Sequence, residues 1–225
     1  MIDHNRLVNT YGDPGLMRYE EATLGYGISM RRWACDVWDY DIANIIGQYT
    51  NYTIFIEDNY FSKWRHCVSS NDGFHYVFRR NTVEGDYGIG SVDGHGSYAD
   101  SNHPYAVGTR AVEVYDNTFK NPDTTWTSIP WALNIRGGSW VVTNNILVGY
   151  YALCDLNNDW GNYEPYTPQC HISDTYIWGN DLGGAQLIKY NWDNTENVNY
   201  FLRAPSLAQD GFEYTPYPYP HPLIH

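Results

Sequence analysis

Six short segments of the chain share one pattern, in which an asparagine at the fourth position stands between apolar residues at the first and sixth. These segments are Ile2–Leu7, Ile56–Phe61, Phe78–Val83, Val114–Phe119, Val142–Leu147 and Ile177–Leu182. Self-similarity at a period of about 20–50 residues is the signature of a solenoid. The last five asparagines are spaced by 22 to 36 residues. Such variable spacing favours a constant strand with loops of variable length and disfavours helical repeats.

The repeat unit has the composition of a β-strand, since β-branched and aromatic residues alternate with polar ones. The fold class predicted is therefore all-β, a right-handed, single-stranded parallel β-helix with long loops. The apolar positions would stack inside the coils, and the asparagines would form a ladder along the corners, where Asn also tolerates left-handed backbone. The alternative is a set of unrelated hairpins that end in Asn turns.

The coils are expected to fill residues 1–200, with a degenerate coil over residues 10–50. Because Ile2–Leu7 is already a repeat unit, the chain is interpreted as the C-terminal part of a longer β-helix. An uncapped first coil would expose strand edges, which predicts self-association. Alternatively, residues 10–50 fold back as the cap.

Residues 201–225 are rich in Tyr and alternate Pro with other residues from Pro216 to Pro222. Alternating proline cannot join a central strand ladder. This segment is predicted to be an extended strap that lies along the side of the solenoid, with its Tyr rings packed onto it. A proline-rich ligand for another domain is the minority interpretation.

The charge and the aromatic content limit the partners. A formal net charge of −13 argues against nucleic acid and against an anionic membrane. No segment has the length and hydropathy of a transmembrane span. The 22 Tyr and 9 Trp residues on an acidic chain suit sugar rings, although many of them would pack between loops. A polysaccharide is the expected partner.

The cysteine count is even, which suits an exported protein. Cys154 and Cys170 bracket a polar loop and are candidates for a local disulfide, and Cys35 with Cys67 would form a second. The alternative is four reduced, buried thiols.

The longest insertion, residues 85–110, carries Asp93 and His95 in a glycine-rich stretch. Ordering glycine is entropically costly, so such a loop suggests tight and specific backbone. Asp93 and His95 could act as an acid–base pair, bind a metal or simply stabilise a turn.

Glu113 lies four residues before its asparagine, where the other coils carry apolar or aromatic residues, including Phe55 and Tyr176. Side chains alternate along a strand, so this row should point outward. Glu113 is then a lone acid on an apolar face and a candidate general acid or base. Arg110 and Arg136 would anchor substrate, or pair with Glu113 structurally. Glu113, Arg136 and His95, from neighbouring coils, form the predicted functional cluster.

A third insertion contains Asp155, Asn157 and Asp159, whose alternating oxygen ligands are reminiscent of a calcium loop. The glycine comes one place late and no bidentate Glu follows, so the match is weak. No motif for nucleotide, zinc or iron–sulfur chemistry is present. No cofactor is therefore required, and calcium is the metal that this loop would take.

Several stretches together resemble the secreted bacterial right-handed parallel β-helix repeat proteins of the pectate-lyase-like superfamily. They are Asp93–Gly96, Gly108–Phe119, Arg136–Gly138, the cysteine loop and the Tyr/Pro-rich tail, so the resemblance covers about residues 50–225. The resemblance implies the fold, export to the extracellular space and a carbohydrate-related role. Neither the catalytic Arg and Asp pattern of pectate lyases nor the paired aspartates of polygalacturonases is present.

Two functions follow as expectations. The first is a polysaccharide-degrading enzyme, a hydrolase or a lyase, in which Glu113 and Asp93 are the carboxylate pair and His95 assists. A lyase would instead need a base and a cation to neutralise the uronate. The second is a non-catalytic carbohydrate-binding or surface-adhesion protein, in which Phe55 and Tyr176 stack on sugars. In an enzyme, Asp93, His95 and Glu113 should lie within reach of one another.

Overall fold

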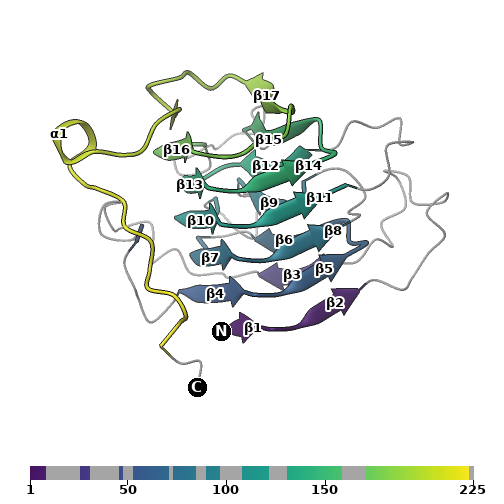
Figure 1. Cartoon of the computed structure of the whole chain (residues 1–225). Coiled ribbons are helices and arrows are strands. Elements are labelled where there is room, and N and C mark those ends of the chain that lie inside the picture. The colour runs from purple at the N-terminus through teal and green to yellow at the C-terminus, as the bar shows by residue number, and fades with distance from the viewer. Residues whose placement is uncertain are drawn as a thin grey trace, which may run out of the picture.

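The structure is a computed structural model that describes residues 1–8, 26–30, 46–47, 53–70, 73–84, 90–96, 108–121, 131–158 and 171–222. Within these residues the fold is all-β apart from one short helix. The strands form three parallel sheets, here called A, B and C, and the chain visits them in turn (Figure 1). Most coils add one strand to each of the three sheets. The parallel solenoid predicted from the repeat is therefore confirmed.

Sheet A is the longest. It contains, in spatial order, β1 (Ile2–Asp3), β4 (Ile54–Glu57), β7 (Tyr76–Arg79), β10 (Val112–Tyr115), β13 (Trp140–Thr143), β16 (Thr175–Trp178) and β18 (Tyr200–Phe201). Sheet B contains β2 (Arg6–Val8), β5 (Tyr60–Ser62), β8 (Thr82–Glu84), β11 (Thr118–Lys120) and β14 (Ile146–Val148). Sheet C contains β3 (Tyr26–Met30), β6 (His66–Ser70), β9 (Val92–His95), β12 (Trp131–Arg136), β15 (Ala152–Asn157) and β17 (Gln186–Trp192).

The apolar repeat positions form continuous stacks because the strands pair in register. In sheet A the stack is Ile2, Ile56, Phe78, Val114, Val142 and Ile177. In sheet B it is Leu7, Phe61, Val83, Phe119 and Leu147. In both stacks, the side chains with sequence numbers from 56 to 147 are completely or almost completely buried. They belong to one core that all three sheets share.

The repeat asparagines lie at the corner between sheets A and B and are hydrogen-bonded to one another along the stack. Nδ2 of Asn59, for example, donates to Oδ1 of Asn81 at 3.1 Å, and Asn81 donates to Asn117 at 3.2 Å. Asn117 donates to Asn145, and Asn145 donates to Asn180, each at 2.9 Å. The series ends at Asn180.

The left-handed residue at each corner is not the asparagine, which corrects the sequence-based expectation. It is the residue before it, at His4, Asp58, Arg80, Asp116, Asn144 and Gly179, with φ between 54° and 65°. The preceding residue turns the chain, and the asparagine is thereby free to point inward and satisfy backbone groups.

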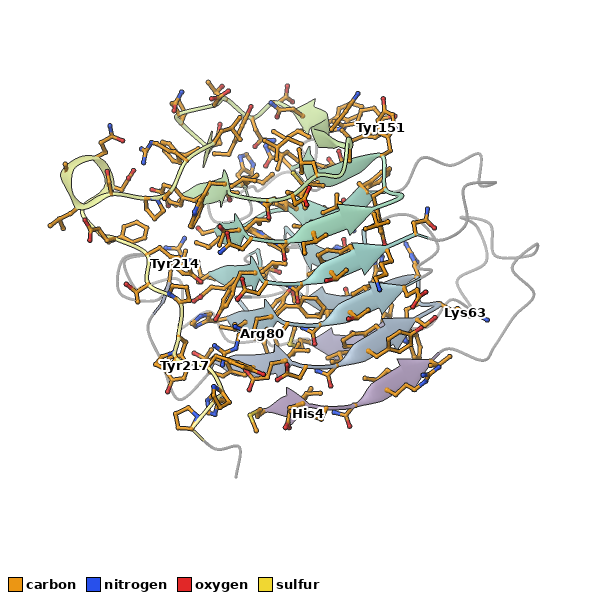
Figure 2. All side chains as sticks on the ribbon, in the orientation of Figure 1. His4, Lys63, Arg80, Tyr151, Tyr214 and Tyr217 are labelled. Carbon is orange, nitrogen blue, oxygen red and sulfur yellow. The ribbon has the colours of Figure 1, made fainter. Side chains whose placement is uncertain are left out.

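After β18 the chain runs through α1 (Leu207–Asp210) and returns as an extended strap along the outside of sheet A, from the last coil toward the first (Figure 1). Tyr214 and Tyr217 lie on this strap (Figure 2). The peptide between Tyr219 and Pro220 is cis. Within the described residues, no helix is long and apolar enough to cross a membrane.

The two disulfides predicted from the sequence are wrong. Cys67 and Cys154 are free and buried, and their thiols donate to the carbonyls of Ser91 and Leu187 at 3.0 and 3.3 Å. Burial raises the pKa of Cys154. Both thiols belong to the core instead of facing a loop, so the cysteines give no support for export; Cys35 and Cys170 lie outside the described residues.

Candidate functional site

Glu113 lies on the outer face of sheet A, in register with Val77 and Val141. It is only 1% exposed, because the strap covers it. Its Oε2 accepts a hydrogen bond from the hydroxyl of Tyr214 at 2.8 Å, and its Oε1 accepts one from the N–H of Gly47 at 2.8 Å. Burial and the nearby Glu113 raise the pKa of Tyr214, which keeps that hydroxyl a donor. Glu113 is therefore held in a buried, hydrogen-bonded position.

The two outward aromatic rings predicted to stack on sugars are also covered. Phe55 packs against Tyr217 and His221, with ring centroids 4.9 and 4.4 Å apart. Tyr176 stacks on Phe201 at 4.9 Å and is buried. A sugar could reach either ring only if the strap left the sheet.

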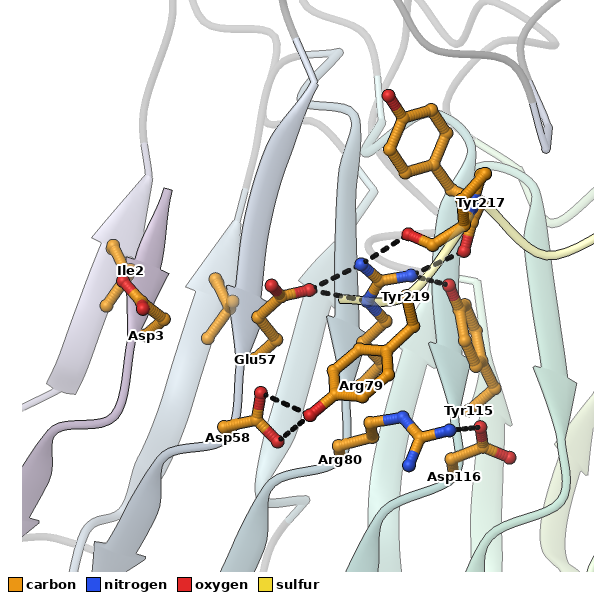
Figure 3. Close-up of polar contacts among 12 residues, drawn as sticks. Ile2, Asp3, Glu57, Asp58, Arg79, Arg80, Tyr115, Asp116, Tyr217 and Tyr219 are labelled. Atoms are coloured by element: carbon orange, nitrogen blue, oxygen red, sulfur yellow. Dashed lines mark hydrogen bonds and ion pairs between the residues drawn. The ribbon is translucent and has the colours of Figure 1, made fainter. Parts of the chain in front are cut away.

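Arg79 fastens the strap to sheet A (Figure 3). Its Nε donates to Oε2 of Glu57 at 2.6 Å, and its Nη1 donates to the hydroxyl of Tyr115 at 3.0 Å. The same guanidinium donates to the carbonyls of Tyr217 and Pro218 at 2.6 and 3.1 Å. The outer face of sheet A is thus a packing interface within the chain.

The structure does not bring Glu113 together with His95 and Arg136, contrary to the predicted cluster. Glu113 is on β10 of sheet A, whereas His95 and Arg136 are paired neighbours on β9 and β12 of sheet C. The reason is that residues 131–136 form a strand of their own before the chain returns to sheet A. Nη1 of Arg110 donates to Oγ of Ser139 at 2.6 Å.

Asp93, His95 and Arg136 do meet, on the outer face of sheet C. Val92 and Gly94 face the core, so Asp93 between them faces outward, yet it is fully buried. Its Oδ1 accepts a hydrogen bond from Nδ2 of Asn134 at 2.7 Å and lies 3.5 Å from Nη1 of Arg136. Burial alone would raise the pKa of Asp93, but His66, His95 and Arg136 outweigh it, so the pKa lies well below its usual range. Asp93 is a permanent anion.

The contact between His95 and Asp93 sets the proton position on the imidazole. Nε2 of His95 lies 2.7 Å from Oδ2 of Asp93, and Nη1 of Arg136 lies 3.0 Å from the same nitrogen. An unprotonated Nε2 would face the carboxylate lone pairs at the shorter of these two distances, so Nε2 carries the proton and donates it to Asp93. Nδ1 is then the nitrogen that takes up a proton. A carboxylate that orients an imidazole in this way is the arrangement used in general base catalysis.

Asp155 is the second carboxyl group on this face, on β15, in register with Asn134. It is 4% exposed, and its Oδ1 has no hydrogen-bond partner among the described residues. Burial raises the pKa of Asp155 to about 6, although Arg136, Lys189 and the N–H of Tyr190 act in the opposite direction. A carboxyl group whose pKa is raised toward neutral pH has the property that a general acid requires.

The weak calcium prediction placed Asp155 with Asn157 and Asp159. In the structure Asp155 is close to two cationic side chains, those of Arg136 and Lys189, and Asp159 lies outside the described residues. Among the described residues no group of three or more His, Cys, Asp or Glu side chains is arranged to hold a metal ion.

Sequence reasoning missed Asn134 and did not recognise Asp155 as an acid. Both belong to a polar row across sheet C that also includes Ser69 and Asp93. A signal was present, because Asp93, Asn134 and Asp155 are each a single polar residue with buried residues on both sides. The row could not be aligned without the register, since the strands of sheet C do not carry the repeated asparagine pattern of the other two sheets.

Comparison of the chain with protein-family models, with curated proteins and with solved structures finds no match.

Proposed function

We propose that this protein hydrolyses a polysaccharide at the outer face of sheet C. The observation that carries the proposal is Asp155, a buried carboxyl group whose pKa is raised to about 6 and whose Oδ1 has no partner in the part of the chain that the structure describes. A buried polar atom without a hydrogen bond is costly, so it is rarely kept without a role. Two strands away on the same face lies Asp93, whose pKa is held well below its usual range. Two carboxyl groups whose environments separate their pKa values are typical of an acid and base assignment.

In this proposal Asp155 donates its proton to the glycosidic oxygen as the bond from that oxygen to the anomeric carbon breaks. A water molecule attacks the anomeric carbon, and Nδ1 of His95 takes up the proton that this water loses. Asp93 holds His95 in orientation and balances the charge of the resulting imidazolium. Solvent then returns a proton to Asp155 and removes one from His95, so that one water molecule is consumed.

The spacing of the strands supports an inverting reaction. Asp93 and Asp155 are each in register with Asn134, so their strands are separated by two strand spacings, about 9.6 Å. Inverting glycosidases place their acid and base groups about 6.5–9.5 Å apart, which leaves room for water. The strand separation is close to the upper end of this range, and the base in this proposal is His95, which Asp93 holds on the same face. Arg136, 17% exposed and next to both groups, is the proposed anchor for a substrate hydroxyl or carboxylate.

We further propose that the solenoid is a right-handed parallel β-helix of the pectate-lyase-like type and that it acts outside the cell. Crossover connections between parallel strands are almost always right-handed, which supports the handedness. The proposed extracellular location is supported by the resemblance and by the substrate class.

A non-catalytic carbohydrate-binding or adhesion role is the second candidate. One observation favours it, namely that Asp93 is already satisfied by Asn134 and His95, as expected of a structural network. The two functions differ in whether Asp155 is needed for product formation.

The test is a screen on a panel of polysaccharides, with and without Ca²⁺, that follows both new reducing ends and the ultraviolet absorbance of unsaturated sugars. Wild type and Asp155→Asn are compared. New reducing ends without absorbance, lost in the variant, are expected. Absorbance would instead indicate a lyase, and absence of product from every substrate would favour the binding role.

A further inference from the structure

We propose that four aromatic rings beside Asp155 form a platform on which a single, soluble glycan chain stacks. The rings belong to Trp131, Tyr151, Tyr190 and Trp192, here called the ring platform. This inference rests on the proposed function, because it names the binding surface that serves the same site.

The ring platform is assembled from neighbouring strands of sheet C near the last coils. Trp131 begins β12, Tyr151 precedes β15, and Tyr190 and Trp192 lie on β17. The ring centroids of Trp131 and Tyr190 are 6.3 Å apart, and those of Tyr190 and Trp192 are 6.4 Å apart. Nζ of Lys189 lies 4.5 Å from the Tyr151 ring centre and 4.9 Å from that of Tyr190. These contacts hold the four rings as one group.

Three of the four rings are exposed, whereas the predicted sugar-binding rings on sheet A are covered, and Trp131 is partly buried. Tyr151, Tyr190 and Trp192 are 40%, 48% and 58% exposed, whereas Phe55 and Tyr176 on sheet A are each 2% exposed under the strap. Tyr151 lies on the side of the stack away from the strap (Figure 2). Large aromatic rings left in water are a cost unless a ligand covers them, and their apolar faces with polar tips match sugar rings.

The ring platform adjoins the carboxyl group of Asp155, the proposed general acid. The backbone N–H of Tyr190 is hydrogen-bonded to the carboxyl group of Asp155, and Lys189, which lies among the rings, acts on the same carboxyl group. A sugar stacked on Tyr190 therefore places the adjoining part of the chain at Asp155. The surface and the acid belong to one binding region.

The ring angles indicate the physical form of the substrate. The planes of Trp131 and Tyr190 are inclined at 82°, and those of Tyr190 and Trp192 at 53°. A flat crystalline fibre could contact only one such ring at a time. A single chain that can twist can contact them in succession, so the structure favours a soluble glycan.

The experiment measures binding in the Asp155→Asn background, so that substrate is not consumed. Migration is measured in native gels that contain soluble β-glucan, xylan, mannan or polygalacturonate, and sedimentation is measured with microcrystalline cellulose and chitin. Tyr190→Ala and Trp192→Ala are the test variants. Tyr219→Ala, a tyrosine of similar exposure (43%) on the strap, is the matched control.

Retardation by at least one soluble polysaccharide is expected, weakened about tenfold or more by each test substitution and unchanged by the control. No retardation in any soluble gel, retardation that survives both ring substitutions, or binding to the insoluble fibres alone would overturn the platform. If product forms but the ring variants bind normally, only the platform fails. If the rings are needed for binding but wild type forms no product, only the hydrolase fails.

Discussion

At the scale of single residues, the corner asparagines perform a task that no other side chain could perform. Nδ2 of Asn117 donates to the carbonyls of Phe78 and Tyr115, at 2.8 and 3.0 Å. Its Oδ1 accepts from the backbone N–H of Asn81 at 2.9 Å. One amide thus satisfies backbone groups of two coils where the strands end. Asp lacks the donors and Ser lacks the reach.

Replacing Asn117 with Ala leaves several buried backbone groups without partners. We expect a loss of about 3–5 kcal/mol in the free energy of unfolding, since each unpaired buried group costs about 1–3 kcal/mol. Asn5→Ala, at the exposed end of the same series, should cost much less. Urea denaturation measures both. Equal costs would show that the internal bonds add nothing.

The raised pKa of Asp155 has a consequence for stability. Its pKa rises from 3.8 to about 6 on folding, so the unfolded chain ionises first, and stability is lost as pH rises through this range. Asp155→Asn removes the penalty. We expect the variant to be more stable than wild type above pH 6, by at most about 3 kcal/mol, with the difference gone below pH 4.

Asp210→Asn is the control of opposite sign. The hydrogen bonds from Arg203 lower the pKa of Asp210 to about 2, against the effect of its burial. Its ionised form therefore stabilises the folded state above pH 4, and the substitution should destabilise the protein there. Thermal unfolding of the two variants across pH 3–8 should give curves that diverge in opposite directions. Parallel curves would contradict the assignment of Asp155.

At the scale of elements, the site depends on a glycine within β9. Gly94 lies between Asp93 and His95, and a Cβ at this position would meet Cζ2 of Trp140 at 2.1 Å. The indole packs beneath the strand and is itself fixed by a hydrogen bond from its Nε1 to the carbonyl of Gly137, 2.9 Å long. Glycine therefore allows β9, which holds Asp93 and His95, to pack closely against the indole of Trp140.

Gly94→Ala should therefore destabilise the protein by about 1–3 kcal/mol, the usual cost of overpacking a core. In a Trp140→Phe background the smaller ring leaves space, so the same substitution should cost less. A double-mutant cycle from chemical denaturation measures this coupling. Additive costs would mean that the indole does not limit β9.

The sequence allowed sheets A and B to be predicted, because the asparagine and its apolar neighbours are local and recur in every coil. The strands of sheet C carry no such marker and follow loops of different lengths, so their register was not predictable. Asp93 and His95 could be paired because they are two residues apart, but the glycine-rich stretch that holds them was expected to be a loop and forms strand β9. The separation of Glu113 from Arg136 could not be foreseen, since it depends on an intervening strand.

At the scale of the whole molecule, the strap links coils that are not neighbours in the solenoid. Coils of a solenoid contact only their neighbours, so stability is nearly a sum of local terms. Here residues 212–221 contact strands from β16 to β4, which connects distant coils directly. We expect this strap to make unfolding more cooperative than the coils alone would allow.

Arg79→Met tests the strap at its buried anchor. The substitution leaves Glu57 buried without its partner, which costs about 3–5 kcal/mol. Hydrogen exchange in residues 212–221 should accelerate. Arg6→Met, on β2 of sheet B, where the guanidinium lies 4.8 Å from the ring centre of Tyr60, should leave the strap protected. Unchanged exchange in Arg79→Met would show that the strap is held by its rings alone.

The central claim is that the reactive face is that of sheet C and not that of sheet A. The most direct measurement compares polysaccharide hydrolysis by Glu113→Gln and Asp155→Asn at equal protein concentration. The amide introduced by Glu113→Gln can keep both contacts, because its oxygen can accept from the N–H of Gly47 while its nitrogen donates to the hydroxyl oxygen of Tyr214, so this variant should keep activity close to wild type. Asp155→Asn should lose at least about a hundredfold. Loss of activity in Glu113→Gln with activity retained in Asp155→Asn would place the site under the strap and contradict the account.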